Sequence, residues 1–326
     1  MAVYTQVDSA ALEAFLAEYE IGMPRSFKGI AEGVENSNYY LETDRGRFIL
    51  TLFEKRVDSA DLPYFISLKQ HLAARDFPCP RPIAGRDGLA LRELCGRPAV
   101  IVSFLDGLSP RQPSRTQCSE LGAGLAEMHL ALEGFSMTRP NSLGPASFAG
   151  LWSGRAAGAE ALEQGLAEEI ETDLRDIVGA RPLSAHLPRG TIHADLFPDN
   201  AFFLDERFSG IIDFYFACTD ALAYDLAICL NAWAFDDAGR ASGLQYSYSH
   251  GAALVSGYDA VRPLSKAERN ALPLLCRTAA MRFFLTRLVD WSDTPADALV
   301  KPKNPLEYAQ RLRFHRHATG PADYGA

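Results

Sequence analysis

The chain has 326 residues, of which 48 % are hydrophobic and 22 % are charged, an ordinary composition for a folded globular protein. This length exceeds what a single hydrophobic core usually organises, so the sequence predicts two lobes. The net charge of −9 argues against nucleic acid or an anionic membrane as a partner, since both attract cationic surfaces.

Six cysteines stand singly along the chain, without the spacing of metal ligands. We interpret them as reduced, mostly buried thiols. The first residues lack the basic and apolar segments of a signal peptide, and no apolar run approaches the roughly 20 residues that span a bilayer. The sequence therefore predicts a cytoplasmic protein and leaves the oligomeric state open.

The first hundred residues predict a small lobe of antiparallel strands with one or two helices. A helix begins at Asp8 or Ser9, and a second covers 57–75, where Lys69 shares one side with apolar residues. The expected strands are 39–43, 47–53, 89–94 and 99–104, the first two joined by a three-residue loop ending at Gly46.

From residue 105 the pattern is mainly helical. Ser114 and Ser265 are each followed three positions later by Gln or Glu, a capping box, and open helices at 114–132 and 265–291, the second bent at Pro273. Other helices are expected at 151–178, 221–235 and 245–258, and strands at 190–193, 201–204 and 210–214. The last ten residues are expected to fray. The prediction is an α+β fold with domains 1–104 and 105–326.

The most informative segment runs from His193 through Asp195 to Asn200, followed by Asp213 inside an apolar run. Phosphotransferases of the protein-kinase fold place a base and two metal ligands with this spacing. Asp195 would accept the proton of the acceptor hydroxyl, and Asn200 and Asp213 would offer hard oxygens to Mg²⁺. Each residue alone could be a turn residue beside Pro198, so the combination carries the prediction.

Two neighbouring polar residues have other interpretations. His193 either orients the loop through a backbone hydrogen bond, which we favour, or takes part in catalysis directly. Asp225 precedes an apolar helix and is expected to cap it.

An ATP site is expected in the first domain, which would make it a nucleotide-binding lobe. Small residues between two strands offer backbone N–H groups and polar side chains to the phosphates: Gly33, Asn36, Ser37 and Asn38. The glycine spacing is not the usual one of kinase loops. The backbone from Ser103 to Leu105, near the domain boundary, could pair with the adenine edge.

These patterns resemble the aminoglycoside phosphotransferase and choline kinase family, the small-molecule branch of the protein-kinase-like fold. The Asp195 and Asp213 segments carry the resemblance, which covers most of the chain. Within the family, segments 33–40, 47–54, 97–107 and 282–291 resemble homoserine kinases of this fold. The resemblance implies phosphorylation of L-homoserine by ATP to O-phospho-L-homoserine, on the way to threonine.

One position departs from the kinase pattern, in which a strand Lys holds phosphates and pairs with a helix Glu. Here Thr51 stands at the expected Lys position, and 57–75 contains no Glu. The phosphate-binding cation is therefore left open among Lys55, Arg56 and Arg47.

A zwitterionic acceptor needs a cation for its carboxylate, and Arg meets carboxylates bidentately. Arg282 and Arg287 lie in an apolar helical stretch, with Arg282 slightly preferred; either could instead pair with a structural carboxylate. Tyr215 could line the acceptor site. Choline or ethanolamine, methylthioribose and aminoglycosides remain alternative acceptors, and a catalytically silent binding module is the non-enzymatic alternative.

Overall fold

The computed structural model describes residues 4–30, 36–54, 58–180, 186–236, 243–295 and 301–326. The chain forms two compact units. Unit 1 comprises Met1–Gly107, Gly134–Met137 and Ser209–Tyr215, and unit 2 comprises the remaining residues. The sequence boundary at residue 104 stays a prediction; the two later segments of unit 1 were not expected there.

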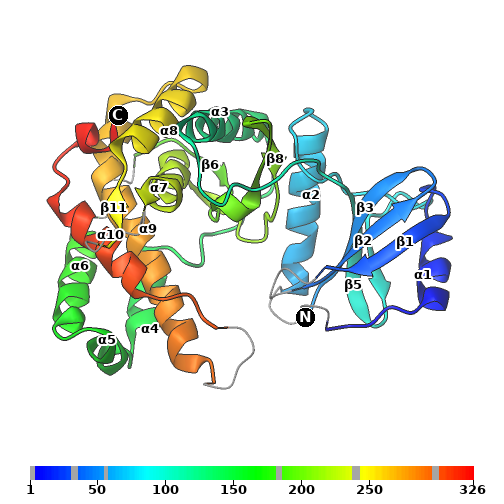
Figure 1. Ribbon diagram of the computed structural model, residues 1–326, viewed down its shortest axis with the longest axis horizontal. Coiled ribbons are helices and arrows are strands. Elements are labelled where there is room, and N and C mark those ends of the chain that lie inside the picture. Colours follow the sequence, from blue (N-terminus) through cyan, green and yellow to red (C-terminus); the bar gives the residue numbers. More distant parts are fainter. Residues whose placement is uncertain (1–3, 31–35, 55–57, 181–185, 237–242, 296–300) are drawn as a thin grey trace. The chain divides into compact units, whose positions relative to one another are not determined.

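Unit 1 is built on a five-stranded antiparallel sheet with the strand order β1-β2-β3-β5-β4 (Figure 1). The strands are β1 (Pro24–Gly29), β2 (Ser37–Thr43), β3 (Gly46–Leu52), β4 (Leu91–Leu94) and β5 (Arg97–Ser103). The sequence missed β1, which is short of apolar residues. The β2–β3 turn holds two residues, Asp44 and Arg45, since Thr43 already pairs with Gly46.

Both faces of this sheet are buried by helices of unit 1. Ala99 and Ile101 of β5 join the core under α1 (Ser9–Leu16), while Val100 and Val102 join the core with Leu62 and Ile66 at α2 (Leu62–Ala73). Side chains alternate between faces along a strand, so an unbroken apolar run in β5 serves two cores.

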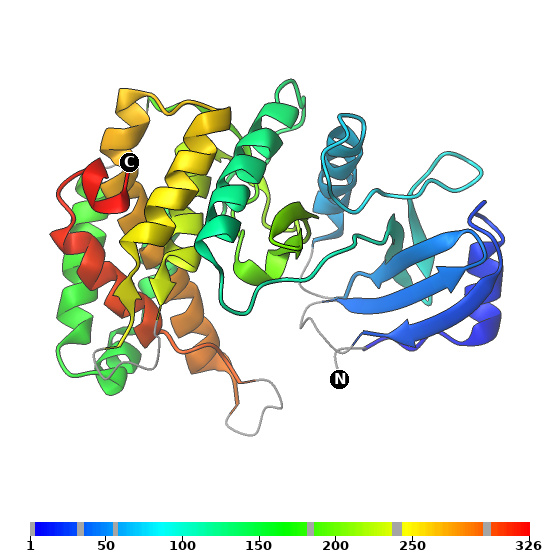
Figure 2. The ribbon, with the colours of Figure 1, turned by 45° about the horizontal axis from the view of Figure 1, so that its top comes forward.

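Unit 2 is mainly helical, as predicted. Its longer helices are α3 (Arg115–Ala131), α6 (Leu166–Ala180), α7 (Leu222–Trp233), α8 (Tyr248–Val261), α9 (Lys266–Asp293) and α10 (Leu306–His317). Helix α8 packs along α3 (Figure 2), and α7 is buried over most of its length and packs on α9. Both predicted capping boxes are confirmed, at Ser114 and Ser265.

Unit 2 also contains the strand pair of β6 (Arg189–Ile192) with β9 (Cys218–Ala221). Strand β7 (Ala201–Leu204) pairs with β8 (Arg207–Ile211), of which only Arg207 and Phe208 belong to unit 2. A pair of two-residue strands, β10 (Phe235–Asp236) and β11 (Gln245–Tyr246), precedes α8. The segment that carries Asp195 connects β6 to β7. The predicted strand at 210–214 ends earlier, so that Asp213 lies just beyond β8.

The structure differs from the sequence prediction at three further places. The helix expected at 151–178 is divided into α4 (Phe148–Trp152), α5 (Ala156–Leu162) and α6, because Gly154 and Gly165 adopt positive φ angles of 75° and 84°. The helix expected from 245 begins at Tyr248. The final residues are packed rather than frayed, with Tyr324 fully buried.

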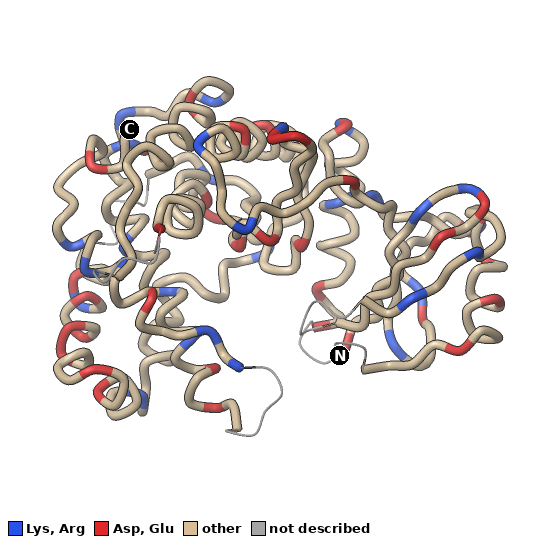
Figure 3. The backbone as a smooth tube through the Cα atoms, viewed as in Figure 1, with Lys and Arg blue, Asp and Glu red and all other residues tan. Residues whose placement is uncertain are grey.

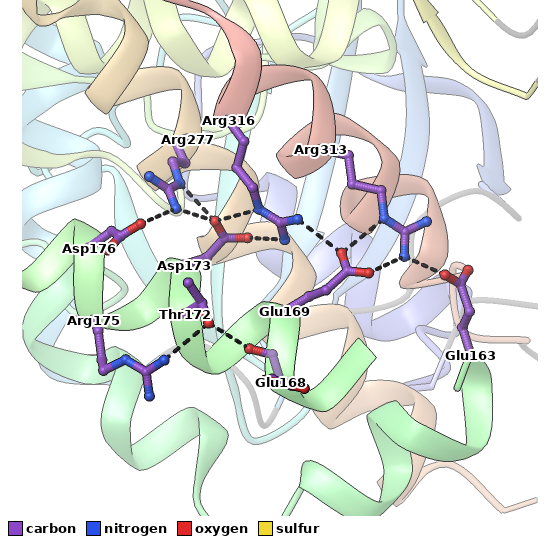
Figure 4. A network of polar contacts seen from close by, with 10 residues as sticks. All are labelled: Glu163, Glu168, Glu169, Thr172, Asp173, Arg175, Asp176, Arg277, Arg313 and Arg316. Atoms are coloured by element: carbon purple, nitrogen blue, oxygen red, sulfur yellow. Dashed lines mark hydrogen bonds and ion pairs between the residues drawn. The ribbon is translucent and has the colours of Figure 1, made fainter. Parts of the chain in front are cut away.

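An ion-pair network joins α6 to α9 and α10 in unit 2 (Figure 4). Asp173 of α6 is fully buried and accepts hydrogen bonds from Arg277 and Arg316, the latter at 2.7 and 2.9 Å. Glu169, one turn earlier, binds Arg313 and Arg316. In Figure 3, acidic residues lie along α6, and the basic residues that pair with them belong to the helices that pack against α6. This network fixes the position of α10.

Among the described residues, none of the helices is both long and apolar enough to cross a membrane. All six cysteines are free thiols, and all but Cys95 are buried, as the sequence predicted.

Candidate functional site

The loop that follows β6 is folded around the backbone of Asp195. The Asp195 carbonyl accepts hydrogen bonds from the Phe197 N–H at 2.9 Å and from Asn200 Nδ2 at 2.8 Å. His193 is fully buried, and its Nδ1 accepts a hydrogen bond from the Asp195 N–H at 3.2 Å. The Asp195 side chain itself is half-buried. Sequence-predicted residues His193, Asp195 and Asn200 therefore form one hydrogen-bonded loop.

Asp225 anchors this loop from helix α7. Its carboxylate accepts hydrogen bonds from the backbone N–H groups of His193 at 2.7 Å and Ala194 at 2.8 Å. It does not cap α7, whose N-cap residue is Ala221, so the capping interpretation was wrong. A carboxylate inside an otherwise apolar helix has to accept hydrogen bonds from buried donors. The position of Asp225 in such a helix was therefore the sequence signal for a buried contact of this kind.

A chain of buried polar groups continues from Asp225 to α8 and α9. His129 of α3 lies 3.2 Å from Asp225 through Nε2 and 2.8 Å from the Tyr258 hydroxyl through Nδ1. Arg262 binds both Tyr258 and Glu268. Burial alone would raise the pKa of Asp225, but the hydrogen bonds from the His129 side chain and the His193 backbone contribute to lowering it, and the net shift is downward.

Two more side chains hold the loop backbone. Arg282 of α9 donates to the Ala194 carbonyl, and Trp233 Nε1 of α7 donates to the Leu196 carbonyl at 2.9 Å. Ala194 has a φ of 65°, a left-handed conformation that is unfavourable for Ala. Partners on both sides of Ala194 keep the loop in this strained form, which is typical of functional sites.

Asp213 and Tyr215 lie in the last segment of unit 1. Asp213 is exposed and has a φ of 61°, again left-handed. The Tyr215 ring packs edge-on against Phe53 and Phe65, with centroids 5.4 and 5.5 Å apart. This aromatic contact anchors the residue that comes two positions after Asp213. A substrate contact for Tyr215 stays a prediction.

Lys69 of α2 is a buried cation in this part of unit 1. Its ammonium lies 5.4 Å from the centroid of the Tyr215 ring, and its side chain is 5 % exposed. Burial lowers the pKa of Lys69 to about 8, with the charges of Cys79 and Asp213 opposing the shift. Sequence reasoning placed Lys69 on the apolar side of its helix without assigning it a role. A lysine on the apolar side of a helix was the sequence signal that this residue has a functional or structural partner, because a buried charge has to be compensated.

The residues expected to bind nucleotide lie around the start of β2. Ser37 is fully buried and its hydroxyl is engaged with the Tyr4 and Thr5 N–H groups and with Glu54. Asn38 Oδ1 accepts a hydrogen bond from Thr51 Oγ1 at 2.8 Å, and the equivalence of Thr51 with the strand lysine of kinases stays a prediction. Asn36 Oδ1 accepts from the Glu54 N–H at 3.4 Å.

Gly33, Lys55 and Arg56 lie outside the described residues. Ser103 at the end of β5 donates its N–H to the Arg81 carbonyl, and its hydroxyl accepts a hydrogen bond from the Arg81 N–H, while Leu105 follows outside the regular elements. Arg47 Nη2 donates to both carboxylate oxygens of Asp106, at 2.9 and 3.0 Å, and the guanidinium lies over the Phe104 ring. The nucleotide assignments of these residues stay predictions.

The two arginines expected to bind substrate have different surroundings. Arg282 is 2 % exposed, lies over Phe283 and contacts the Asp195 loop, an arrangement that supports the loop. Arg287, five residues later, donates to the Asn304 carbonyl at 3.1 Å and to Glu307 at 2.7 Å. Their substrate roles stay predictions. Sequence reasoning missed Lys303 and Tyr308, which lie in the same part of unit 2.

Asn200 of unit 2 and Asp213 of unit 1 each carry an oxygen of the hard kind that magnesium takes. Asn200 gives its amide N–H to Asp195, so its amide oxygen faces the other way, and Asp213 offers an exposed carboxylate. The described residues contain no cluster of three or more His, Cys, Asp or Glu side chains for a metal. Mg²⁺ typically takes one or two protein ligands and completes its shell with phosphate oxygens and water, so the metal assignments of Asn200 and Asp213 stay predictions.

Comparison with known proteins identifies the family. The model of the phosphotransferase enzyme family matches residues 26–264. A homoserine kinase of Hyphomonas neptunium is 66 % identical over 328 residues, and one of Xanthobacter autotrophicus is 56 % identical over 325 residues. The first alignment covers all of both chains, and the second covers all of this chain and 99 % of the relative.

Solved structures show the same fold at low sequence identity. The amicoumacin kinase hAmiN, solved with AMP-PNP and Ca²⁺, aligns with a TM-score of 0.65 at 13 % identity over 95 % of this chain and 92 % of that chain. Choline kinase of Cryptosporidium parvum gives 0.63 at 15 % identity over 95 % and 94 %. The predicted kinase-like α+β fold and the predicted family are thus confirmed: the chain belongs to the phosphotransferase enzyme family.

Proposed function

We propose that the chain transfers the γ-phosphoryl group of ATP to the side-chain hydroxyl of L-homoserine, giving ADP and O-phospho-L-homoserine. The observation that supports L-homoserine as the acceptor is the 66 % identity to a homoserine kinase over the whole of both chains. The structural neighbours, at 13 to 16 % identity, support the fold alone and favour no other acceptor.

In this proposal Asp195 acts as the general base. Its carboxylate accepts the proton of the acceptor hydroxyl as that oxygen bonds to the γ-phosphorus, and the bond to the leaving ADP breaks. The chain holds Asp195 in place through His193, Asn200 and the Asp225 anchor, and such fixed orientation is the main protein contribution to phosphoryl transfer.

Asn200 and Asp213 would hold the magnesium ion, which neutralises charge on the phosphates when bound. We assign to Lys69 the cationic role that a strand lysine has in other kinases. Thr51 leaves that strand position uncharged, and Lys69 brings a positive charge to the neighbourhood of Asp213 from the helix instead.

A panel of acceptors tests this function. The protein is incubated with Mg-ATP and, separately, with L-homoserine, choline, ethanolamine, methylthioribose and an aminoglycoside, and ADP release is followed. Release confined to L-homoserine is the expected result. Release with another acceptor would redirect the assignment, and absence of release with every acceptor would favour a binding module.

A further inference from the structure

Lys303 is an exposed cation beside the Asp195 loop. Its ammonium lies 5.5 Å from the centroid of the Phe197 ring, and Phe197 comes two residues after Asp195. Within the described part of the chain, Lys303 forms no ion pair. An ammonium that rests on an aromatic ring of the loop and has no carboxylate partner is available to an anionic group of a ligand.

Tyr308 supplies a second unsatisfied group in the same part of unit 2. Its side chain is fully buried, and its hydroxyl has no hydrogen-bond partner among the residues that the structure describes. The ring lies between the guanidinium groups of Arg287 and Arg311, 4.6 and 4.5 Å from its centroid. Burial raises the pKa of the Tyr308 hydroxyl, and the negative charge of Asp195 contributes to this rise. Buried hydroxyls are nearly always satisfied, so this one is expected to meet a ligand or water.

Arg287 holds the two residues in place. Its Nη1 donates to the Asn304 carbonyl, next to Lys303, and to Glu307, next to Tyr308. These contacts tie the segment before α10 to α9. Since the Arg287 side chain is only 12 % exposed and already paired with Glu307, we regard it as a positioning residue.

We propose that Lys303 binds the carboxylate of the amino-acid acceptor and that the Tyr308 hydroxyl hydrogen-bonds to the same acceptor. This inference rests on the proposed function and adds the residues that select an acceptor with a carboxylate. A cationic acceptor such as choline would be repelled by Lys303, while a carboxylate near Asp195 requires a cation of this kind.

The test compares two acceptors that differ by the carboxylate: L-homoserine and 3-aminopropan-1-ol, the second measured as a substrate or as a competitive inhibitor. Lys303→Met is expected to lower kcat/KM for L-homoserine about 100-fold, the effect of losing a charged hydrogen bond. Its interaction with 3-aminopropan-1-ol, a cation without the carboxylate, should stay the same or become tighter, and its KM for ATP should match that of the wild type. Lys266→Met, which changes another exposed lysine of unit 2, is the matched control.

Tyr308→Phe keeps the ring between the two arginines and removes only the hydroxyl. We expect about a 10-fold loss in kcat/KM for L-homoserine with no loss of thermal stability. Equal effects of Lys303→Met on both acceptors, or wild-type kinetics in both variants, would overturn the inference. A wild-type protein that fails to phosphorylate L-homoserine would instead contradict the proposed function itself.

Discussion

The fully buried carboxylate of Asp225 on α7 accepts hydrogen bonds from the backbone N–H groups of His193 and Ala194, at 2.7 and 2.8 Å. These contacts come immediately before Asp195 in the chain. The base proposed for phosphoryl transfer therefore depends for its position on a buried carboxylate 30 residues later.

Replacing Asp225 should impair turnover and stability together. In Asp225→Asn the amide N–H₂ would face one of the two backbone N–H groups and leave that donor unpaired. We expect kcat to fall at least about 100-fold, because small displacements of reacting groups have effects of this size. The free energy of unfolding should fall by about 3 kcal/mol, as for broken buried ion pairs. Kinetics and urea unfolding measure both. Asp176→Asn, in an exposed ion pair on α6, should change neither.

Arg282 distinguishes support of the loop from recognition of the substrate. Because its guanidinium is buried and contacts the Ala194 carbonyl, we expect Arg282→Met to lower kcat about 10-fold or more, with KM for the acceptor nearly unchanged. Steady-state kinetics with varied L-homoserine separate the two parameters. A large rise in KM at constant kcat would return Arg282 to the substrate role that its sequence position first suggested.

Lys69 should matter for the nucleotide and little for folding. Lys69→Met removes a buried ammonium, so the melting temperature should stay the same or rise. We expect kcat/KM for ATP to fall roughly 10- to 100-fold, the range for one charged contact. Lys28→Met, which replaces an exposed lysine of β1, is the control. Unchanged ATP kinetics in Lys69→Met would contradict the cationic role.

His315 makes the stability of unit 2 sensitive to acid. Burial, together with the charges of Arg311 and Arg277, lowers the pKa of His315 to about 3. The neutral ring satisfies both nitrogens, one with Tyr324 and one with Asn231. Below pH 6.5 His315 binds a proton in the unfolded chain but stays neutral in the folded chain. The free energy of unfolding therefore decreases as the pH is lowered from 6.5 to about 3.

The expected slope is up to about 1.4 kcal/mol per pH unit from this group. Urea unfolding between pH 7 and 5 should show a shallower dependence for His315→Gln than for the wild type. His317→Gln, two positions along α10 and exposed, should keep the wild-type slope. Parallel slopes in all three proteins would exclude His315 as the source.

The sequence predicted the parts of this molecule that depend on local pattern. Apolar runs and turn signals predicted β2 to β5 of the small lobe, and Ser114 and Ser265 marked the starts of two helices. The spacing of Asp195, Asn200 and Asp213 depends on one short segment and could be seen directly. The break at Gly165 was missed because an acidic helical pattern continues across it.

The rest depends on partners that are distant along the chain. Asp225 looks like a cap until its donors, 31 and 32 residues earlier, are known. Lys69 is a single charged residue on an apolar helix face. Its ammonium lies over the ring of Tyr215, a residue far along the chain, and the sequence alone does not report this contact. The contact between Lys303 and Phe197 joins residues more than one hundred positions apart, which no local periodicity reports.

The most direct test of the account is the phosphorylation of L-homoserine by the wild-type protein and by Asp195→Asn. With Mg-ATP, the wild type should release ADP only when L-homoserine is present, and ³¹P NMR should detect O-phospho-L-homoserine in equal amount. Asp195→Asn should fold normally and turn over about 10² to 10⁴ times more slowly. ADP release that does not depend on L-homoserine, or near-normal turnover by Asp195→Asn, would contradict the account.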